Sequence, residues 1–471
     1  MATQLEFSRP QQIAVQRLVE LPMALSVFIG LLSDCYPILG LRRKPYLLIG
    51  LVLNAVGTIA IGIIAAHFES LDIDGHRNQA LVVLLLLMVA IASFGCIMTY
   101  LAVQTRTIEL SQQEPLGIRG AIQADYLIVR RIGAITASVF SFLVLGTSPS
   151  TTTRSSLGDN TANISLSNAL FLSAIICVLP LPVILRSWYE EFYSLPVSID
   201  VRGKIFWKIM QQKAVWRTLT FVAFFSMFLS VRFVDSANVV RAWAGAEKDH
   251  TFVLRMITEA INLLVIVVWR LVFMNRPWRS VFGLAPFFQV VPAMFISAFV
   301  AYNVNRDRYL YRAISSLTSV ADGINFLTNI VPVTEIVQEG SEGVTVGLVL
   351  SLQRLIGIFV NTNAQGLFRG DNFYSPAQAK LDTRDSRTDV FLSLVLNYGI
   401  NALAVVGLLF LPTQKLDAQQ MRMYGGFTKI ASSAIVVFAA VLFVYSMTIN
   451  TMTFIPKTAC ARIVGGPGCG K

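Results

Sequence analysis

Long apolar runs alternate with short polar or charged gaps along nearly the whole chain. Each run has about the 20 residues that an α-helix needs to cross the hydrocarbon core of a bilayer. A backbone within hydrocarbon must satisfy its own hydrogen bonds, so these runs predict membrane-spanning helices. We expect twelve of them, over residues 11–32, 45–67, 79–103, 120–146, 167–187, 217–238, 252–274, 283–302, 310–336, 343–367, 390–412 and 428–450.

The composition agrees with an all-α polytopic membrane protein. Of 471 residues, 55% are apolar and only 14% are charged, whereas soluble domains carry about 25% charged residues. This balance excludes a disordered chain and a small secreted domain held by disulfides. The net charge of +11 sits in the gaps between runs, where membrane lipid headgroups rather than nucleic acid are the expected partner. Cys460 and Cys469 share a polar tail and could pair in an oxidising compartment.

The charged gaps predict the orientation of the chain in the membrane. Three consecutive cations place the first connection in the cytosol under the positive-inside rule: Arg42, Arg43 and Lys44. The loops 69–79 and 146–166 then fall outside. In the second half the bias reverses, because a loop expected outside also carries four cations: Arg369, Lys380, Arg384 and Arg387.

Two further features bear on location. The outside loop 146–166 holds the sequon Asn163-Ile164-Ser165, so Asn163 is a candidate glycosylation site. Residues 1–10 show no pattern of a cleavable signal. Because no retention signal is visible either, we expect a multi-pass protein of the plasma membrane.

A long cytosolic connection divides the chain into two helical bundles. We expect an N-terminal bundle of five spans over 1–186, a linker with an amphipathic stretch over 187–216, and a C-terminal bundle of six spans over 217–412. Residues 413–471 would add one further span and an outward polar tail. Two bundles joined in this way are typical of secondary transporters.

The first cytosolic loop carries a motif. Residues 30–46 read GLLSDCYPILGLRRKPY and resemble the G-x-x-S-D-x-x-P-I-x-G-x-R-R-x-x-Y signature of the folate-biopterin transporter family, a branch of the major facilitator superfamily. Weaker similarity lies at 109–120 and 340–347, and the resemblance runs from about residue 20 to 412. It implies a two-bundle fold and a pterin-like substrate. If the signature loop joins helices two and three, as in that family, the chain has eleven core helices and one C-terminal extra.

Two positions depart from the family pattern. Family members usually have a lysine where this chain has Ser26, and an acid in the fourth helix where this chain has Gln104. Both changes remove charge from the pathway that the resemblance implies.

Polar residues recur on one face of the expected helix 310–336. They are Ser315, Thr318, Asp322, Asn325 and Asn329, and steps of three or four residues place them in one stripe. Because an ionisable residue near the bilayer centre costs about 2.5–3.5 kcal/mol, Asp322 needs a cavity or a partner. Either Asp322 belongs to a substrate or proton site, or it is buried against an arginine of another helix.

Several cations also fall inside expected spans. Arg130 or Arg131 could grip the carboxylate of a folate-like substrate through two parallel hydrogen bonds, or could form a structural salt bridge with Asp125. Arg354 is a candidate counter-ion for Asp322 or for an anionic substrate. Arg255 and Glu259 are expected to neutralise each other at i, i+4. The candidate substrate-binding set is Arg130, Arg131, Asp322, Asn325, Asn329, Arg354 and Gln104.

The cytosolic motifs predict a gate. Asp34 lies at the inner end of one half, and a helix N-terminus, which attracts anions, begins near Glu342 in the other. The cations Arg42, Arg43 and Lys44 could meet Glu339 or Glu342. The alternative for the cations is simple anchoring to headgroups.

The function expected from these patterns is secondary active transport. A small organic anion, most simply folate- or biopterin-like, would cross by alternating access, with protons as a hypothetical coupling ion. Enzyme chemistry is not expected, since the three histidines lack metal-ligand spacing and no nucleophile motif occurs. No cofactor, catalytic residue or metal is expected. The alternative is a non-transporting relative that acts as a receptor or scaffold, which Ser26 and Gln104 favour.

Overall fold

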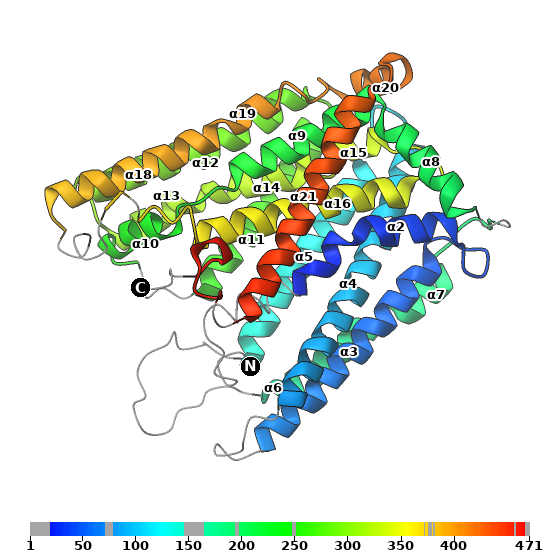
Figure 1. Cartoon of the computed structure of the whole chain (residues 1–471), viewed down its shortest axis with the longest axis horizontal. Helices are drawn as coiled ribbons and strands as arrows, with labels where there is room; N and C mark the ends of the chain where they lie inside the picture. Colours follow the sequence, from blue (N-terminus) through cyan, green and yellow to red (C-terminus); the bar gives the residue numbers. More distant parts are fainter. Residues whose placement is uncertain are drawn as a thin grey trace. The chain divides into compact units, whose positions relative to one another are not determined.

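The computed structural model describes residues 19–70, 79–145, 164–193, 197–246, 251–371, 373–374, 379, 382–455 and 458–466. Regular structure within these ranges is helical (Figure 1), apart from two isolated β-bridges. The all-α fold class is therefore confirmed. The first nine helices are α2 (Ser26–Cys35), α3 (Lys44–Ser70), α4 (Gln79–Gln113), α5 (Ala121–Leu145), α6 (Leu166–Val178), α7 (Leu181–Ser187), α8 (Ile199–Met210), α9 (Lys213–Leu229) and α10 (Val234–Trp243).

The second part of the chain continues in the same manner. Its helices are α11 (Thr251–Val268), the π-helix η1 (Trp269–Phe273), α12 (Trp278–Ala301), α13 (Arg308–Ser316), α14 (Thr318–Thr328), α15 (Val331–Ile336), α16 (Glu342–Gln365), α18 (Arg384–Ala402), α19 (Ala404–Gly407), α20 (Lys415–Tyr424), α21 (Lys429–Phe454) and the 3₁₀ turn η2 (Arg462–Val464). Nine helical segments in the described ranges are long and apolar enough to cross a membrane, or ten if α9 and α10 form one bent span.

Proline explains where two expected helices are divided. The run 167–187 forms α6 and α7, which meet at Pro180. The run 310–336 forms α13, α14 and α15, and Pro332 lies at the start of α15. Proline has no N–H for the bond to the carbonyl four residues earlier, so the helical ladder is interrupted there. The break between α13 and α14 lies at Leu317 and has no proline, and the polar stripe of this run is distributed over these short helices.

The chain forms two compact units. The first contains residues Met1–Leu110, Thr136–Trp207 and Val337–Arg354, and the second contains Ser111–Ile135, Lys208–Ile336 and Leu355–Lys471. Helices α4, α5 and α16 therefore each contribute to both units. The predicted bundle boundaries stay a prediction.

Small residues set the packing of the first unit. In α3 and α4, a Cβ atom placed on Gly50 would lie 2.7 Å from the carbonyl oxygen of Gly95. Helix α2 meets the first turns of α16 even more closely, since a Cβ on Gly30 would lie 2.0 Å from the carbonyl oxygen of Gly343. Gly343 and Gly347 form a G-x-x-x-G pair, which lets two helix backbones approach in a membrane.

Aromatic and aliphatic side chains fill the second unit. Helix α12 packs against both α14 and α18, and α9 packs against α19. Phe221 and Phe225 of α9 lie with ring centroids 5.1 Å apart, and Phe221 stacks on Phe282 of α12. All three rings are fully buried. These contacts hold α9 and α12 firmly in the interior of this unit.

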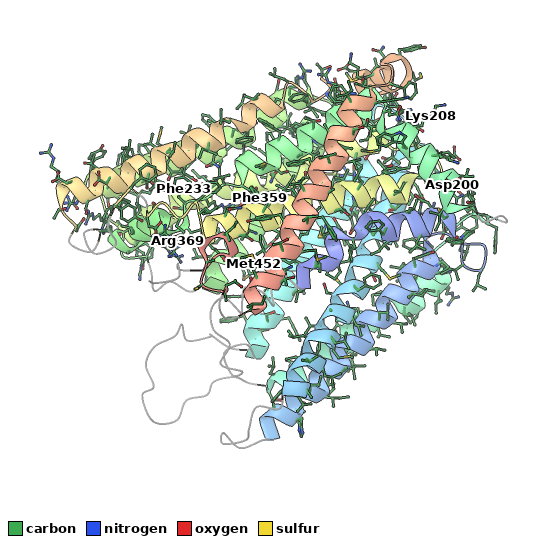
Figure 2. The ribbon with its side chains drawn as sticks, in the orientation of Figure 1. Asp200, Lys208, Phe233, Phe359, Arg369 and Met452 are labelled. Carbon is green, nitrogen blue, oxygen red and sulfur yellow. The ribbon has the colours of Figure 1, made fainter. Side chains whose placement is uncertain are left out.

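Helices α9 and α10 are bent by 42° at the residues between them. The amide of Asn401 in α18 donates to the carbonyl oxygens of Phe228, Leu229 and Val231, at 2.8, 3.2 and 2.9 Å. Asn397 accepts from the backbone N–H of Phe233 at 3.1 Å, and Figure 2 labels Phe233 at this bend. Side chains of α18 thus satisfy the backbone groups that the bend removes from the helical ladder.

Candidate functional site

Arg43 lies at the centre of a buried ionic cluster in the first unit. Its guanidinium is 2.7 Å from Asp34 Oδ1, 2.8 Å from Glu109 Oε1 and 3.2 Å from Glu342 Oε2. We call these four residues the Arg43 cluster. Burial disfavours the charged form of the 1% exposed Arg43 side chain, but the three carboxylates outweigh it and hold the pKa of Arg43 above its ordinary value.

Asp34 also binds the N-terminus of α16. Its two carboxylate oxygens accept from the backbone N–H groups of Gly343 and Val344, at 3.1 and 2.8 Å. These N–H groups have no partner within the helix, and the helix dipole favours an anion there. Glu342 accepts from the N–H of Gly340 at 2.6 Å. One aspartate therefore joins the end of α2 to the first turn of α16.

Glu190 clamps the signature loop from outside the motif. Its carboxylate accepts from the backbone N–H groups of Arg42, Arg43 and Lys44, at 2.7, 2.7 and 2.8 Å. Sequence reasoning missed Glu190, because a single acid in the linker carries no spacing signal. These three hydrogen bonds fix the backbone at residues 42–44 and so position the Arg43 side chain in the Arg43 cluster.

The expectation for the neighbouring cations is wrong. Arg42 lies over the ring of Tyr193, 3.6 Å from its centroid. Lys44 donates to the carbonyl oxygens of Leu185 and Trp188, and Glu339 is exposed. In the described residues, the expected pairing with Glu342 is made by Arg43 alone among the three cations. The reason is geometric, because consecutive side chains at the start of a helix point in different directions.

Arg131 forms a partly buried ion pair in the second unit. Its Nη1 lies 2.9 Å from Glu259 Oε2 of α11, and its guanidinium is 4.2 Å from the ring centroid of Phe326 in α14. The guanidinium of Arg130 lies 5.3 Å from the same centroid. Cations at these distances interact favourably with a ring face.

Two expected partners are corrected by these contacts. Asp125 pairs with Arg270 of η1 at 2.6 and 2.8 Å, and not with Arg131. Glu259 pairs across helices with Arg131, although an i, i+4 pair with Arg255 was expected. An inter-helix partner is favoured because a bidentate or well-aligned guanidinium contact is stronger than an exposed pair along one helix.

Asp322 faces a different partner from the expected one. It lies 3.2 Å from Arg232, and the two side chains are 46% and 57% exposed. Arg354 instead contacts Glu20 in the first unit. Asp322 and Arg354 belong to different units, and each has an ion-pair partner within its own unit; the role of Arg354 as a counter-ion for Asp322 or for an anionic substrate stays a prediction. The Asp322–Arg232 pair therefore lies at the surface of the described structure rather than in its interior.

Two further stripe residues, Asn325 and Asn329, face α9. Asn325 and Asn329 each accept from the hydroxyl of Ser226, at 3.3 and 3.4 Å. Gln104 lies in the first unit, is 2% exposed, and its Oε1 has no hydrogen-bond partner among the described residues. The seven candidate substrate-binding residues are thus divided, with Gln104 and Arg354 in the first unit and the others in the second.

Ion pairs explain the reversed charge bias of the second half. Arg369 pairs with Asp235 at 2.6 Å, and Figure 2 labels Arg369. Asp382 takes bidentate contacts from Arg306 and Arg387, between 2.6 and 3.1 Å. These hydrogen bonds, those of Arg306 first, hold the pKa of Asp382 well below its usual range. Two of the four cations of this loop, Arg369 and Arg387, thus serve tertiary structure, so their charges say little about orientation.

Asp382→Asn is expected to destabilise the protein at neutral pH and to lose this effect in acid. A depressed pKa in the folded state contributes stability above the unfolded value of about 3.9, and that stability is lost as the pH falls towards the folded pKa. The thermal unfolding midpoints of wild type and variant, measured from pH 7 to pH 3, should therefore converge below about pH 4. Asp385→Asn in the first turn of α18 is the control. A gap between wild type and Asp382→Asn that stays constant down to pH 3 would contradict this account.

Some predicted sites cannot be placed. Asn163 and Lys380 lie outside the described residues. Cys460 is disulfide-bonded, while its predicted partner Cys469 also lies outside them.

Comparisons with known proteins agree with this architecture. Residues 1–423 match the model of the BT1 family, and no curated protein sequence matches the chain. Among solved structures, the D-xylose–proton symporter has a TM-score of 0.56 at 14% identity, covering 86% of this chain and 90% of that one. A double-tryptophan mutant of XylE has a TM-score of 0.57 at 14% identity, covering 92% and 91%. These likenesses show the major-facilitator fold, and the family match shows that the chain belongs to the BT1 family, the folate-biopterin transporters, and is a multi-pass membrane transporter.

Proposed function

We propose that this chain is a secondary active transporter that moves a small organic anion of the folate or biopterin type across the plasma membrane. Alternating access would expose one site to each side in turn, and protons would be the coupling ion. The observation that carries the proposal is the group formed by Arg131, Glu259 and Phe326, because it places an arginine fork beside an aromatic ring inside a predicted span.

The chemistry of this group suits a flat anion. A guanidinium binds a carboxylate through two parallel hydrogen bonds, and Arg131 already holds one carboxylate, that of Glu259, at 2.9 Å. A substrate carboxylate could replace Glu259 as the partner of Arg131. The ring of Phe326 offers a face on which a pterin could stack, and the amides of Asn325 and Asn329 offer hydrogen bonds to its edge.

Proton coupling is supported by the accessible pair of Asp322 and Arg232. A carboxylate that can exchange its arginine partner for a proton links protonation to a change of contacts. The D-xylose–proton symporter, a protein of the same fold, is a symporter by name. We infer that Asp322 is the proton-accepting group.

The Arg43 cluster would supply the gate. It joins the end of α2, the inner part of α4 and the first turn of α16 through one buried guanidinium. Opening the inner side would separate these elements, so the cluster must break in every transport cycle. A set of contacts of this kind biases the equilibrium between two states without taking part in binding.

A receptor or scaffold without transport is the second candidate. Family members usually have a lysine and an acid at the positions of Ser26 and Gln104. Both residues are buried here, so this chain has neutral side chains in its interior where its relatives have charged ones. If transport has been lost, binding of a pterin would persist without uptake.

Uptake of labelled folate and biopterin into vesicles, with and without a proton gradient, tests the proposal. We expect uptake that the gradient stimulates, and a decrease of about ten- to a hundredfold in Arg131→Gln, as expected for loss of a hydrogen-bonded charge pair with the substrate. Arg270→Gln removes a more exposed ion pair, with no ring contact among the described residues, and should change uptake little.

The variant Asp322→Asn separates coupling from binding. It should still bind substrate but should lose the stimulation by the gradient. Gradient-independent uptake in wild type, unchanged by Asp322→Asn, would refute the proton hypothesis. Binding of folate or biopterin without any uptake would favour the receptor.

A further inference from the structure

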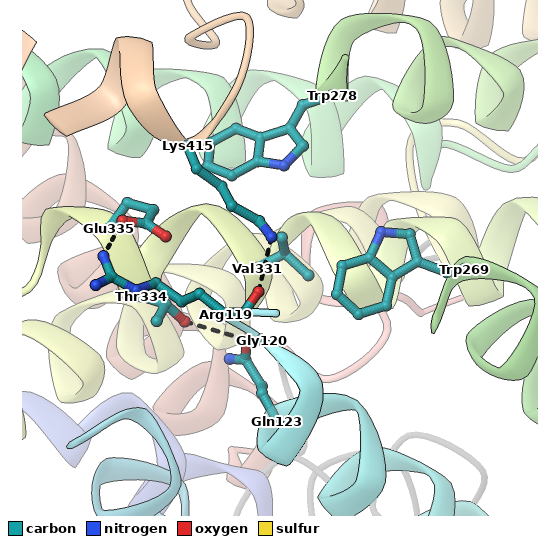
Figure 3. A pocket seen from close by; sticks show the side chains of 9 residues that line it. All are labelled: Arg119, Gly120, Gln123, Trp269, Trp278, Val331, Thr334, Glu335 and Lys415. Atoms are coloured by element: carbon teal, nitrogen blue, oxygen red, sulfur yellow. Dashed lines mark hydrogen bonds and ion pairs between the residues drawn. The ribbon is translucent and has the colours of Figure 1, made fainter. Parts of the chain in front are cut away.

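A small pocket in the second unit lies apart from the residues of the proposed substrate site. It is formed where the loop before α5, the π-helix η1, the start of α12, the short helix α15 and α20 meet (Figure 3). By the predicted orientation all these segments are cytosolic ends. The pocket is lined by Arg119, Gly120, Gln123, Trp269, Trp278, Val331, Thr334, Glu335 and Lys415. We call it the tryptophan pocket.

Two buried hydrogen-bond donors in this pocket have no acceptor. Trp269 and Trp278 are 2% and 1% exposed, and the indole N–H of each has no partner among the described residues. In Figure 3 the two ring nitrogens and the ammonium nitrogen of Lys415 face the same space. An unpaired buried donor costs about 1–3 kcal/mol, so two that share one pocket indicate an acceptor that binds between them.

Lys415 adds a positive charge to these donors. Its ammonium donates to the carbonyl oxygen of Arg119 at 2.8 Å and to Asn275 Oδ1 at 3.1 Å. An ammonium has three N–H groups, so these two bonds leave one for a ligand. The side chain is 5% exposed, and an anion beside it would therefore be held in surroundings that strengthen charge interactions.

Two side-chain acceptors of the pocket already hold a donor. Glu335 Oε2 accepts from Arg119 at 3.1 Å and from Gln419 at 2.7 Å. The amide oxygen of Gln123 accepts from the hydroxyl of Thr334 at 3.1 Å. A water molecule would need acceptors for its own two protons, and these two oxygens each hold at least one donor already. An anion without protons needs only donors, which the pocket supplies.

We propose that the tryptophan pocket binds one small inorganic anion, a halide such as chloride, between the indole N–H groups of Trp269 and Trp278 and the ammonium of Lys415. The free space is about that of one water-sized group, which is far too small for a pterin. The anion would link η1 and α12 to α20 and, through Lys415, to the loop that carries Arg119. It would thus stabilise the cytosolic end of the second unit whatever the transported substrate is.

Thermal unfolding of the purified full chain in chloride and in gluconate, at equal ionic strength, tests the proposal. We expect a higher unfolding midpoint in chloride, because a ligand that binds only the folded state stabilises it. Trp269→Phe and Trp278→Phe each remove one donor and keep an aromatic ring, although a smaller one. The chloride concentration for half of the shift should rise about ten- to a hundredfold in each. Trp216→Phe is the matched control, since its indole N–H also lacks a partner in the described structure but lies outside the pocket.

A second measurement keeps the test valid if a variant folds poorly. Crystals of the wild-type protein grown in bromide should show an anomalous peak between Trp269, Trp278 and Lys415. A water molecule there with no anomalous signal, or a chloride shift that both tryptophan variants retain unchanged, would overturn the proposal. Neither readout depends on uptake, so the proposed function and this site can fail separately.

Discussion

Replacing Arg43 with methionine is expected to destabilise the protein by about 3–5 kcal/mol, because it leaves uncompensated charges buried. Without the guanidinium, Asp34, Glu109 and Glu342 would lie close together with no cation between them. Thermal or denaturant unfolding of the purified protein measures the loss of stability, and vesicle uptake measures the loss of function. Both should fall sharply.

Two further variants separate the charge of Arg43 from its geometry. Arg43→Lys keeps the charge but cannot extend a fork to three carboxylates, so it should recover part of the stability and little of the uptake. Arg106→Met removes the other arginine that contacts Glu109, a partly exposed one, and should cost less than about 1 kcal/mol. If Arg43→Met proves no worse than Arg106→Met, the Arg43 cluster is neither a structural centre nor a gate.

Gly30→Val should have the second large effect. A Cβ at position 30 would lie 2.0 Å from the carbonyl oxygen of Gly343 and 2.9 Å from the backbone nitrogen of Val344. Overpacking usually costs about 1–3 kcal/mol. Here both obstructing atoms belong to a helix backbone that cannot rotate aside, so we expect the upper end of that range or more. The yield of folded protein and its unfolding midpoint should both drop.

A glycine elsewhere on α16 provides the control for Gly30→Val. Around Gly357 no heavy atom lies within 4 Å of an added Cβ. Gly357→Ala should therefore be neutral or stabilise the helix by about 0.5–1 kcal/mol. Equal behaviour of the two variants would show that α2 and α16 do not need their close approach.

Hydrophobic runs were sufficient to predict the fold class, because the length of a span is set by the bilayer and not by tertiary contacts. The run 45–67 corresponds to α3 and the run 120–146 to α5. Internal breaks were missed at Pro180 and Pro332, although proline is visible in the sequence, since many helices in membranes tolerate it. Helix α12 shows the difficulty, because it contains Pro286 and Pro292 and continues through both.

The sequence showed which charged residues lie inside the expected spans, but it predicted less well which residues they pair with. Arg131 and Glu259 are 128 positions apart in the sequence, and Asp322 and Arg232 are 90 apart. Such pairs depend on how each helix is rotated about its axis, which a single sequence does not determine. The family motif marks Asp34 and Arg43, but the sequence did not distinguish Arg43 from Arg42 and Lys44 as the partner of Glu342.

The support that Asn401 gives to the bend has a mechanical consequence. The carbonyl groups of Phe228, Leu229 and Val231, at and after the end of α9, all accept from the side-chain amide of Asn401 in α18. A movement of α10 relative to α18 would break these hydrogen bonds and leave the carbonyl groups without a donor inside the membrane. A movement of α10 and α18 together would keep the bonds. We therefore expect α10 and the adjoining part of α18 to move together as one rigid body.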